Sequence, residues 1–401
     1  MTEARPLLGK LQHGEDIEQH ATIGTSYLGL MSTMAGACIL ALPSTMGASH
    51  VIPNTILLII VTVLSLLACS CLVIACDATG VYSYELLSKR LCSPWQIWAI
   101  RALTMGLLFG AVVMYIVISM DMLEPFVPLS RFVLGALFTI ISLPMCLPDT
   151  IHALRYTNFL VVLCVMYIVA ILSWHAFQNP WPNVSLTSPI TYSAIAYTMP
   201  IQALSYCCHL NVARAYGELE HRSNITIVSS LIMVSGGILY FIASLAGYVC
   251  FQGMPPADIL TGFSSDDTSV NGVRIALGLC MICKTPVTFQ PFREVIELVC
   301  LGPATHEEQR HRMPFRVFAT SIFLLASFIL AVSAQDISVV MGLIGGTSGV
   351  LLSFTVPGYF VWQVTQAQDH GLLPDELKKY RILAVVMMAT GFLFTIVSLT
   401  K

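Results

Sequence analysis

Residues 33–43 read Thr-Met-Ala-Gly-Ala-Cys-Ile-Leu-Ala-Leu-Pro, inside an apolar stretch that runs from residue 24 to residue 48. This stretch is long enough to cross the hydrocarbon core of a membrane as a helix. Gly36 and Pro43 both weaken a helix, because glycine leaves the backbone flexible and proline lacks the N–H group that a helix interior needs. We therefore expect a membrane helix that is interrupted near its middle.

The rest of the chain predicts many more spans. Of the 401 residues, 56% are hydrophobic and only 10% are charged, whereas soluble domains carry roughly 25% charged residues. Apolar runs recur, separated by breaks rich in Pro, Gly, Asn and charge, which predicts an all-α, polytopic membrane protein with about eleven transmembrane helices. The candidate spans cover residues 24–48, 51–76, 98–120, 131–148, 155–177, 190–217, 226–252, 272–300, 314–334, 337–364 and 381–400.

The distribution of basic residues predicts the orientation of these spans. If the N-terminus is cytosolic, most of the 19 Lys and Arg residues lie on the cytosolic side, as the positive-inside rule requires. Arg131, Arg274 and Lys401 lie on the opposite side, and Lys284 lies within a span. The sequon at Asn183 falls in an outward loop, where it is a candidate for glycosylation.

Several classes of protein are not supported by the sequence. A net charge of −3 is too small to suggest a nucleic-acid-binding protein. The 13 cysteines fall mostly in apolar runs without a completed metal-ligand spacing, so we predict no metal site, no cofactor and no disulfide framework. No set of catalytic residues is evident, which argues against an enzyme.

The composition of residues 1–22 predicts a disordered cytosolic tail without a signal peptide, followed by a membrane domain over residues 23–400.

The spans can be divided into two inverted repeats of five helices with one helix left over. The first repeat would cover about 24–177, the second about 190–364, and residues 381–400 would form the extra helix. Span six would then correspond to span one, and it also contains helix-breaking signals, namely Pro200 and the polar cluster at 206–211. Interrupted helices at matching positions indicate the substrate site of a transporter. Kinked helices that merely pack through small residues are the alternative.

Five motifs, in order, are distributed over nearly the whole chain. They are residues 33–43, Tyr206-Cys-Cys-His-Leu-Asn-Val with Tyr216-Gly-Glu-Leu, Gly247-Tyr-Val-Cys-Phe-Gln-Gly, Lys284-Thr-Pro-Val-Thr-Phe-Gln-Pro-Phe-Arg, and Gly342-Leu-Ile-Gly-Gly-Thr with Pro357-Gly-Tyr-Phe. Together they resemble the amino acid/auxin permease family, which includes the sodium-coupled neutral amino acid transporters and their lysosomal relatives. The resemblance implies the LeuT-like inverted-repeat fold of eleven helices and the transport of an amino acid.

The resemblance implies a substrate site at the first-helix break. The half-helix N–H groups there can bind a carboxylate, and unwound carbonyl groups can bind an ammonium group. His209 could instead be a hydrogen-bonded clamp between helices, and Cys38, where the family has a second glycine, could be a packing residue. Because no intramembrane carboxylate is evident in the pocket, we predict neutral substrates. The candidate substrate-binding residues are Thr33, Met34, Gly36, Ala37, Cys38, Ile39, Tyr206, His209 and Asn211.

Lys284 is the feature that sets this chain apart from its sodium-coupled relatives. Those relatives place a threonine at this position and an asparagine on the first helix, where this chain has Gly29. Both oxygen ligands of the ion would then be absent, while a lysine ammonium group could occupy the same carbonyl-rich site. We predict sodium-independent transport, proton-coupled or facilitative. The alternatives are that Lys284 faces a water-filled vestibule, or that Thr285 is the ligand in a register shifted by one residue.

The N-terminal tail contains a candidate sorting signal. Glu3, Leu7 and Leu8 match the acidic dileucine pattern that clathrin adaptor complexes read. We therefore predict a lysosomal or vacuolar membrane, with the plasma membrane as the alternative. A membrane sensor that binds an amino acid and signals without net transport is the alternative function, although only about 22 residues precede the first span.

Overall fold

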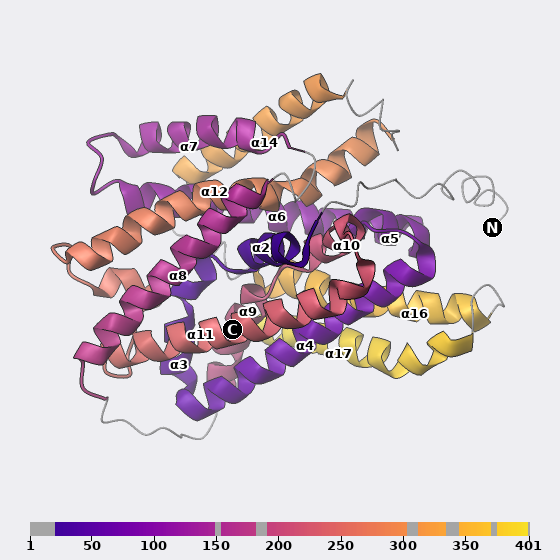
Figure 1. The fold of residues 1–401 in the computed structure, drawn as a ribbon, viewed down its shortest axis with the longest axis horizontal. Helices are drawn as coiled ribbons and strands as arrows, with labels where there is room; N and C mark the ends of the chain where they lie inside the picture. The colour runs from indigo at the N-terminus through magenta and orange to yellow at the C-terminus, as the bar shows by residue number, and fades with distance from the viewer. Residues whose placement is uncertain are drawn as a thin grey trace.

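The computed structural model describes residues 21–148, 154–181, 191–302, 312–333, 345–369 and 375–399. These residues form a bundle of helices (Figure 1), which confirms the all-α prediction. Within the described ranges there is no β-strand, and a single isolated parallel bridge joins Ala21 to Leu219.

The first predicted span is a broken helix. It consists of α2 (Ile23–Met34), the short 3-10 helix η1 (Ala37–Leu40) and α3 (Leu42–Ser49), and its two halves are bent by 55°. The interruption lies at residues 35 and 36. Pro43 does not cause it, because Pro43 sits in the first turn of α3, where a missing N–H group breaks no helical hydrogen bond.

Seven further helices are long and apolar enough to cross a membrane. Large hydrophobic side chains are exposed on their outer faces, as expected for contact with lipid tails. These helices are α4 (Val51–Thr79), α6 (Pro94–Leu123), α8 (Arg155–Gln178), α11 (Ile225–Cys250), α12 (Thr268–Cys300), α14 (Met313–Ser333) and α17 (Arg381–Leu399).

The remaining three predicted spans are shorter or interrupted. Span four corresponds to α7 (Arg131–Met145), an apolar helix of 15 residues. Span six is divided into α9 (Tyr192–Ser205) and α10 (His209–Glu218). The described part of span ten begins with two π-helical turns, η5 (Gly345–Gly349) and η6 (Leu351–Thr355), and continues as α16 (Val356–Asp369). A total of eleven membrane crossings therefore stays a prediction.

A short helix that the sequence patterns did not predict connects α4 to α6. This helix, α5 (Tyr84–Leu91), is amphipathic and too short to cross a membrane. It is attached to the bundle by a buried ion pair in which Arg101 Nη2 lies 2.6 Å from Glu85 Oε1. The Tyr84 hydroxyl also donates to the carbonyl oxygen of Leu352, 2.7 Å away.

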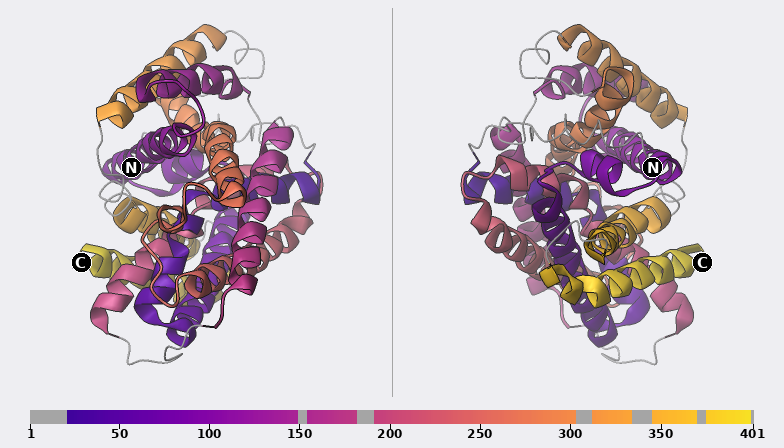
Figure 2. Two further views of the ribbon diagram at one scale, coloured as in Figure 1. Left: turned by 90° about the vertical axis from the view of Figure 1, so that its left-hand side faces the viewer. Right: turned by 90° about the vertical axis from the view of Figure 1, so that its right-hand side faces the viewer.

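The helix α2 lies at the centre of the molecule (Figure 1). It packs against α8, α10, α11 and α12. The helices α7 and α14 pack together along one edge, which is at the top of Figure 1 and Figure 2, and α16 and α17 pack together away from that edge. The first interrupted span is therefore enclosed by other helices. Interrupted helices inside a bundle are typical of the substrate site of a transporter.

Candidate functional site

The interruption of the first span is occupied by the side chain of Lys284. This residue belongs to α12, and its Nζ atom donates a hydrogen bond of 2.9 Å to the carbonyl oxygen of Ala35. A Cβ atom added to Gly36 would lie only 2.3 Å from the same Nζ. A glycine at position 36 is therefore what allows the ammonium group to approach the backbone of the break.

The Lys284 ammonium group is buried, with 4% of the residue exposed. The aromatic ring of Tyr115 lies beneath it, with the ring centre 5.7 Å from Nζ, and such a ring attracts a cation through its negative face. Among the described residues no carboxylate forms an ion pair with Lys284. A buried charge without a counter-charge is costly, so the carbonyl oxygen and the ring are what stabilise it.

The other two predicted ion-site residues have different partners. The Thr285 hydroxyl donates to the carbonyl oxygen of Met281, 2.9 Å away in its own helix. The carbonyl oxygen of Gly29 accepts hydrogen bonds from the hydroxyl groups of Ser32 and Thr33, at 2.8 Å and 3.0 Å. Of the two neighbouring residues on α12, it is Lys284 that reaches the break.

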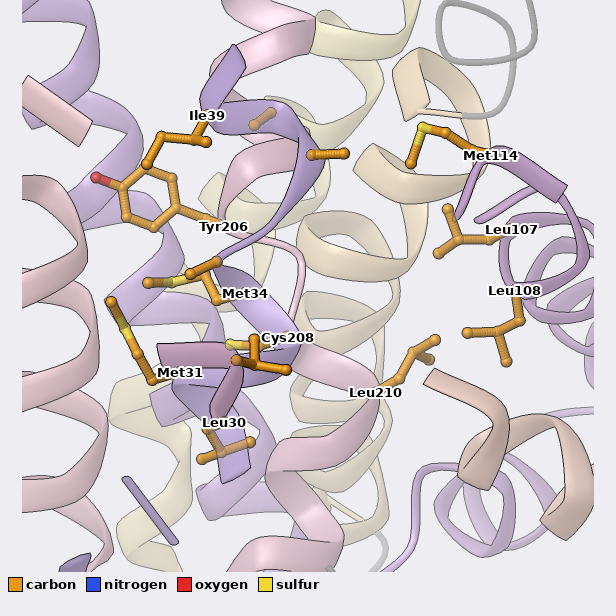
Figure 3. Close-up of a cluster of buried hydrophobic side chains, with 14 of the residues drawn as sticks. Leu30, Met31, Met34, Ile39, Leu107, Leu108, Met114, Tyr206, Cys208 and Leu210 are labelled. Carbon is orange, nitrogen blue, oxygen red and sulfur yellow. The ribbon is translucent and has the colours of Figure 1, made fainter. Parts of the chain in front are cut away.

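The second interruption lies between α9 and α10, at residues 206–208. Pro200 lies inside α9 and removes one helical hydrogen bond before the break. The Tyr206 hydroxyl is 2.7 Å from the hydroxyl of Thr62 on α4. Figure 3 shows the Tyr206 ring next to Met34 and Ile39, which come from the two sides of the first break, so the two interruptions face each other.

His209 and Asn211 connect α10 to other helices. His209 Nε2 donates to the carbonyl oxygen of Ser65 on α4 at 3.2 Å, which is the geometry of a clamp between helices. Asn211 Nδ2 lies 3.2 Å from Thr33 Oγ1 and 3.4 Å from the carbonyl oxygen of Val287. Asn211 therefore joins three helices, α2, α10 and α12, at the level of the first break.

The three predicted residues of η1 differ in burial. Ala37 and Ile39 are buried, whereas Cys38 is partly exposed. The 3-10 helix η1 packs against α9, whose last residue is Ser205. Cys38 therefore lies where the two breaks meet, and it forms no disulfide.

Sequence reasoning missed three polar residues of this site. They are Tyr115 on α6, Asn158 on α8, which accepts from the Ser32 hydroxyl at 2.8 Å, and Tyr240 on α11. Each of these residues places a hydrogen-bonding side chain inside an apolar run of the sequence. Such a side chain needs a partner in the membrane, and this could have identified the three residues. Glu3, Leu7, Leu8 and Asn183 lie outside the described residues, and their roles stay predictions.

The sequence comparisons agree with this geometry. The family model described as transmembrane amino acid transporter protein matches residues 19–401. The chain belongs to this transporter family. One relative of this transporter is the sodium-coupled neutral amino acid transporter 7 of Xenopus laevis, which is 23% identical over 381 residues, covering 86% of this chain and 83% of the relative. The resemblance predicted from the five motifs is confirmed, and with it a role in amino acid transport.

Solved structures show the same fold for the transporter. The structure of MhsT in complex with L-phenylalanine superposes with a TM-score of 0.64 at 12% identity, covering 94% of this chain and 99% of that chain. A Na⁺-coupled sialic acid symporter in a substrate-bound outward-open state gives a TM-score of 0.60 at 15% identity, covering 99% and 95%. These likenesses show the fold alone, and they confirm the predicted LeuT-like architecture.

Proposed function

We propose that this transporter carries neutral amino acids across a membrane without sodium, in symport with protons. The observation that supports the proposal is the hydrogen bond from Lys284 Nζ to the carbonyl oxygen of Ala35, inside the break of the first span. The carbonyl-rich environment at such a break suits a cation. In this chain the protein itself supplies the positive charge.

A lysine differs from a bound metal ion because it can release and take up a proton. The ammonium form of Lys284 donates to Ala35 and lies over the Tyr115 ring. The neutral amine would lose most of the attraction to both groups. A change in its protonation would therefore change how strongly α12 is attached to the broken span, which is the coupling that a proton-driven transporter needs.

The proposed substrate is an amino acid without a charged side chain. Around the two breaks the described residues offer hydroxyl, amide and thiol groups, such as Thr33, Asn211 and Cys38, but no carboxylate that could pair with a cationic side chain. The name of the Xenopus laevis relative also refers to neutral amino acids, although it describes that protein as sodium-coupled. We attribute the difference in coupling between this chain and that relative to Gly29 and Lys284.

The proposal is tested by uptake of radiolabelled amino acids into proteoliposomes that contain the purified full chain. An inward proton gradient without sodium should drive accumulation, and an inward sodium gradient at equal pH should not. Specific binding of an amino acid without uptake under either gradient would overturn the proposal. That outcome would favour the alternative function, a sensor that binds an amino acid and signals without net transport.

A further inference from the structure

Two half-helices end close to each other in the middle of the bundle. The helix α2 ends at Met34, and α9 ends at Ser205. The last carbonyl groups of a helix have no partner within that helix, and inside a membrane an unsatisfied carbonyl is costly. Among the described residues, no backbone N–H group of the following loops donates to the carbonyl oxygen of Met34 or Ser205.

One side-chain hydroxyl group lies within hydrogen-bonding distance of both carbonyl oxygens. Tyr240 Oη lies 3.1 Å from the Met34 carbonyl oxygen and 2.6 Å from the Ser205 carbonyl oxygen. Tyr240 belongs to α11 and is completely buried. A tyrosine hydroxyl has only one proton to donate, so the two half-helix ends share one donor.

The surroundings of Tyr240 hold this hydroxyl in place. The Tyr206 ring packs edge-on against the Tyr240 ring, with 5.2 Å between the ring centres. One turn before Tyr240, a Cβ atom added to Gly236 would lie 2.1 Å from Met34 Cε. The helix α11 therefore lies directly against the end of α2.

The geometry points to Tyr240 as the residue that couples the two interrupted spans. By sharing its one proton between the two carbonyl oxygens, the hydroxyl ties the ends of α2 and α9 to the same point of α11. Tyr240 is thus a positioning residue, since it acts through the backbone of both breaks. The inference rests on the proposed function only in that these breaks form the substrate site.

Hydrogen–deuterium exchange of the purified full chain tests the coupling without a substrate. Tyr240→Phe keeps the ring but removes the donor, which leaves the buried carbonyl oxygens at the two half-helix ends without a partner. Amide exchange should therefore become about tenfold faster in the peptides that cover residues 33–40 and in those that cover residues 204–211. The matched control is Tyr248→Phe, since Tyr248 lies on the same helix and is also buried, and its hydroxyl forms no hydrogen bond among the described residues.

Three outcomes of the exchange measurement decide whether Tyr240 couples the two breaks. Faster exchange at both breaks in Tyr240→Phe, with the control unchanged, supports the coupling. Faster exchange at only one break, or at neither, overturns it. An equal loss of protection along all helices would show a purely structural role and would also overturn it.

Transport gives a second readout that separates this inference from the proposed function. If the wild-type protein transports an amino acid, Tyr240→Phe should raise the KM for that amino acid about tenfold, while Tyr248→Phe should leave it unchanged. An unchanged KM would contradict the coupling. Failure of the wild-type protein to transport any amino acid would overturn the proposed function, and the exchange measurement would still decide the role of Tyr240.

Discussion

At position 36 the absence of a side chain determines how closely Lys284 approaches the backbone. The Nζ atom occupies the space that the Cβ atom of any other residue would take. Because the clashing atom is the far end of a flexible side chain, a larger residue there would displace the ammonium group rather than unfold the protein. The contact between Lys284 and Ala35 can thus be weakened without unfolding the protein.

Gly36→Ala should reduce transport about tenfold or more, because it moves Lys284 Nζ away from the Ala35 carbonyl oxygen and removes a charge-assisted hydrogen bond. The melting temperature should fall, because the buried ammonium group loses one of its two partners, but the protein should stay folded. The measurement is initial uptake per folded molecule, with thermal melting in parallel. Gly106→Ala is the control, since a Cβ atom there meets nothing within 4 Å. Equal activity of the two variants would contradict the role given to this contact.

The sequence predicted some of these residues and not others, for a physical reason. Lys284 stood out because a charge inside an apolar span is costly and therefore rare. Its acceptor could not be predicted, because every residue has a backbone carbonyl group and the residue type of Ala35 does not show that its own is free to accept. Tyr240 was missed for a related reason: its two partners are also carbonyl oxygens, which are defined by where helices end.

At the scale of the elements, prolines have different consequences in different helices. The interruptions of spans one and six were predicted from glycine and proline, yet Pro43 begins α3 and does not break it. The helix α12 continues through Pro286 and Pro291 without interruption. Pro291 cannot donate to the carbonyl oxygen of Val287, four residues earlier, and the amide of Asn211 donates to it at 3.4 Å. This compensation comes from another helix and could not be read from the local sequence.

Asn211→Leu should lower the free energy of unfolding by ~1–3 kcal/mol, because the Val287 carbonyl oxygen loses its partner. Pro291→Ala restores a backbone N–H group in the right place. Thermal melting of both single variants and the double variant measures the coupling between them. The loss caused by Asn211→Leu should be smaller in the presence of Pro291→Ala. Simple additivity of the two effects would contradict this explanation.

At the scale of the whole molecule, Ala21 is hydrogen-bonded to the segment that follows α10. The Ala21 N–H group donates to the Glu218 carbonyl oxygen at 3.0 Å, and the Glu220 N–H group donates to the Ala21 carbonyl oxygen at 3.1 Å. The described part of the chain therefore begins beside this segment. We propose that its dileucine signal addresses the transporter to a lysosomal or vacuolar membrane through clathrin adaptor complexes.

Replacing both Leu7 and Leu8 by alanine should move a fluorescently tagged protein to the cell surface, because the adaptors can no longer bind the apolar pair. Surface biotinylation and microscopy measure the change. Leu11→Ala, three residues beyond the motif on the same tail, is the control and should not relocate the protein. If the double variant stays in internal membranes, the sorting proposal is wrong. The result leaves the transport mechanism unaffected.

Sodium dependence at fixed pH tests the role of Lys284 most directly. Initial uptake of a neutral amino acid is measured in proteoliposomes with sodium or with choline outside, for the wild-type protein and for Lys284→Thr. We predict equal uptake in the two salts for the wild-type protein and a strong loss of uptake in Lys284→Thr, since the built-in cation is then absent. Wild-type uptake that is several-fold higher in sodium would show that Lys284 does not replace the ion.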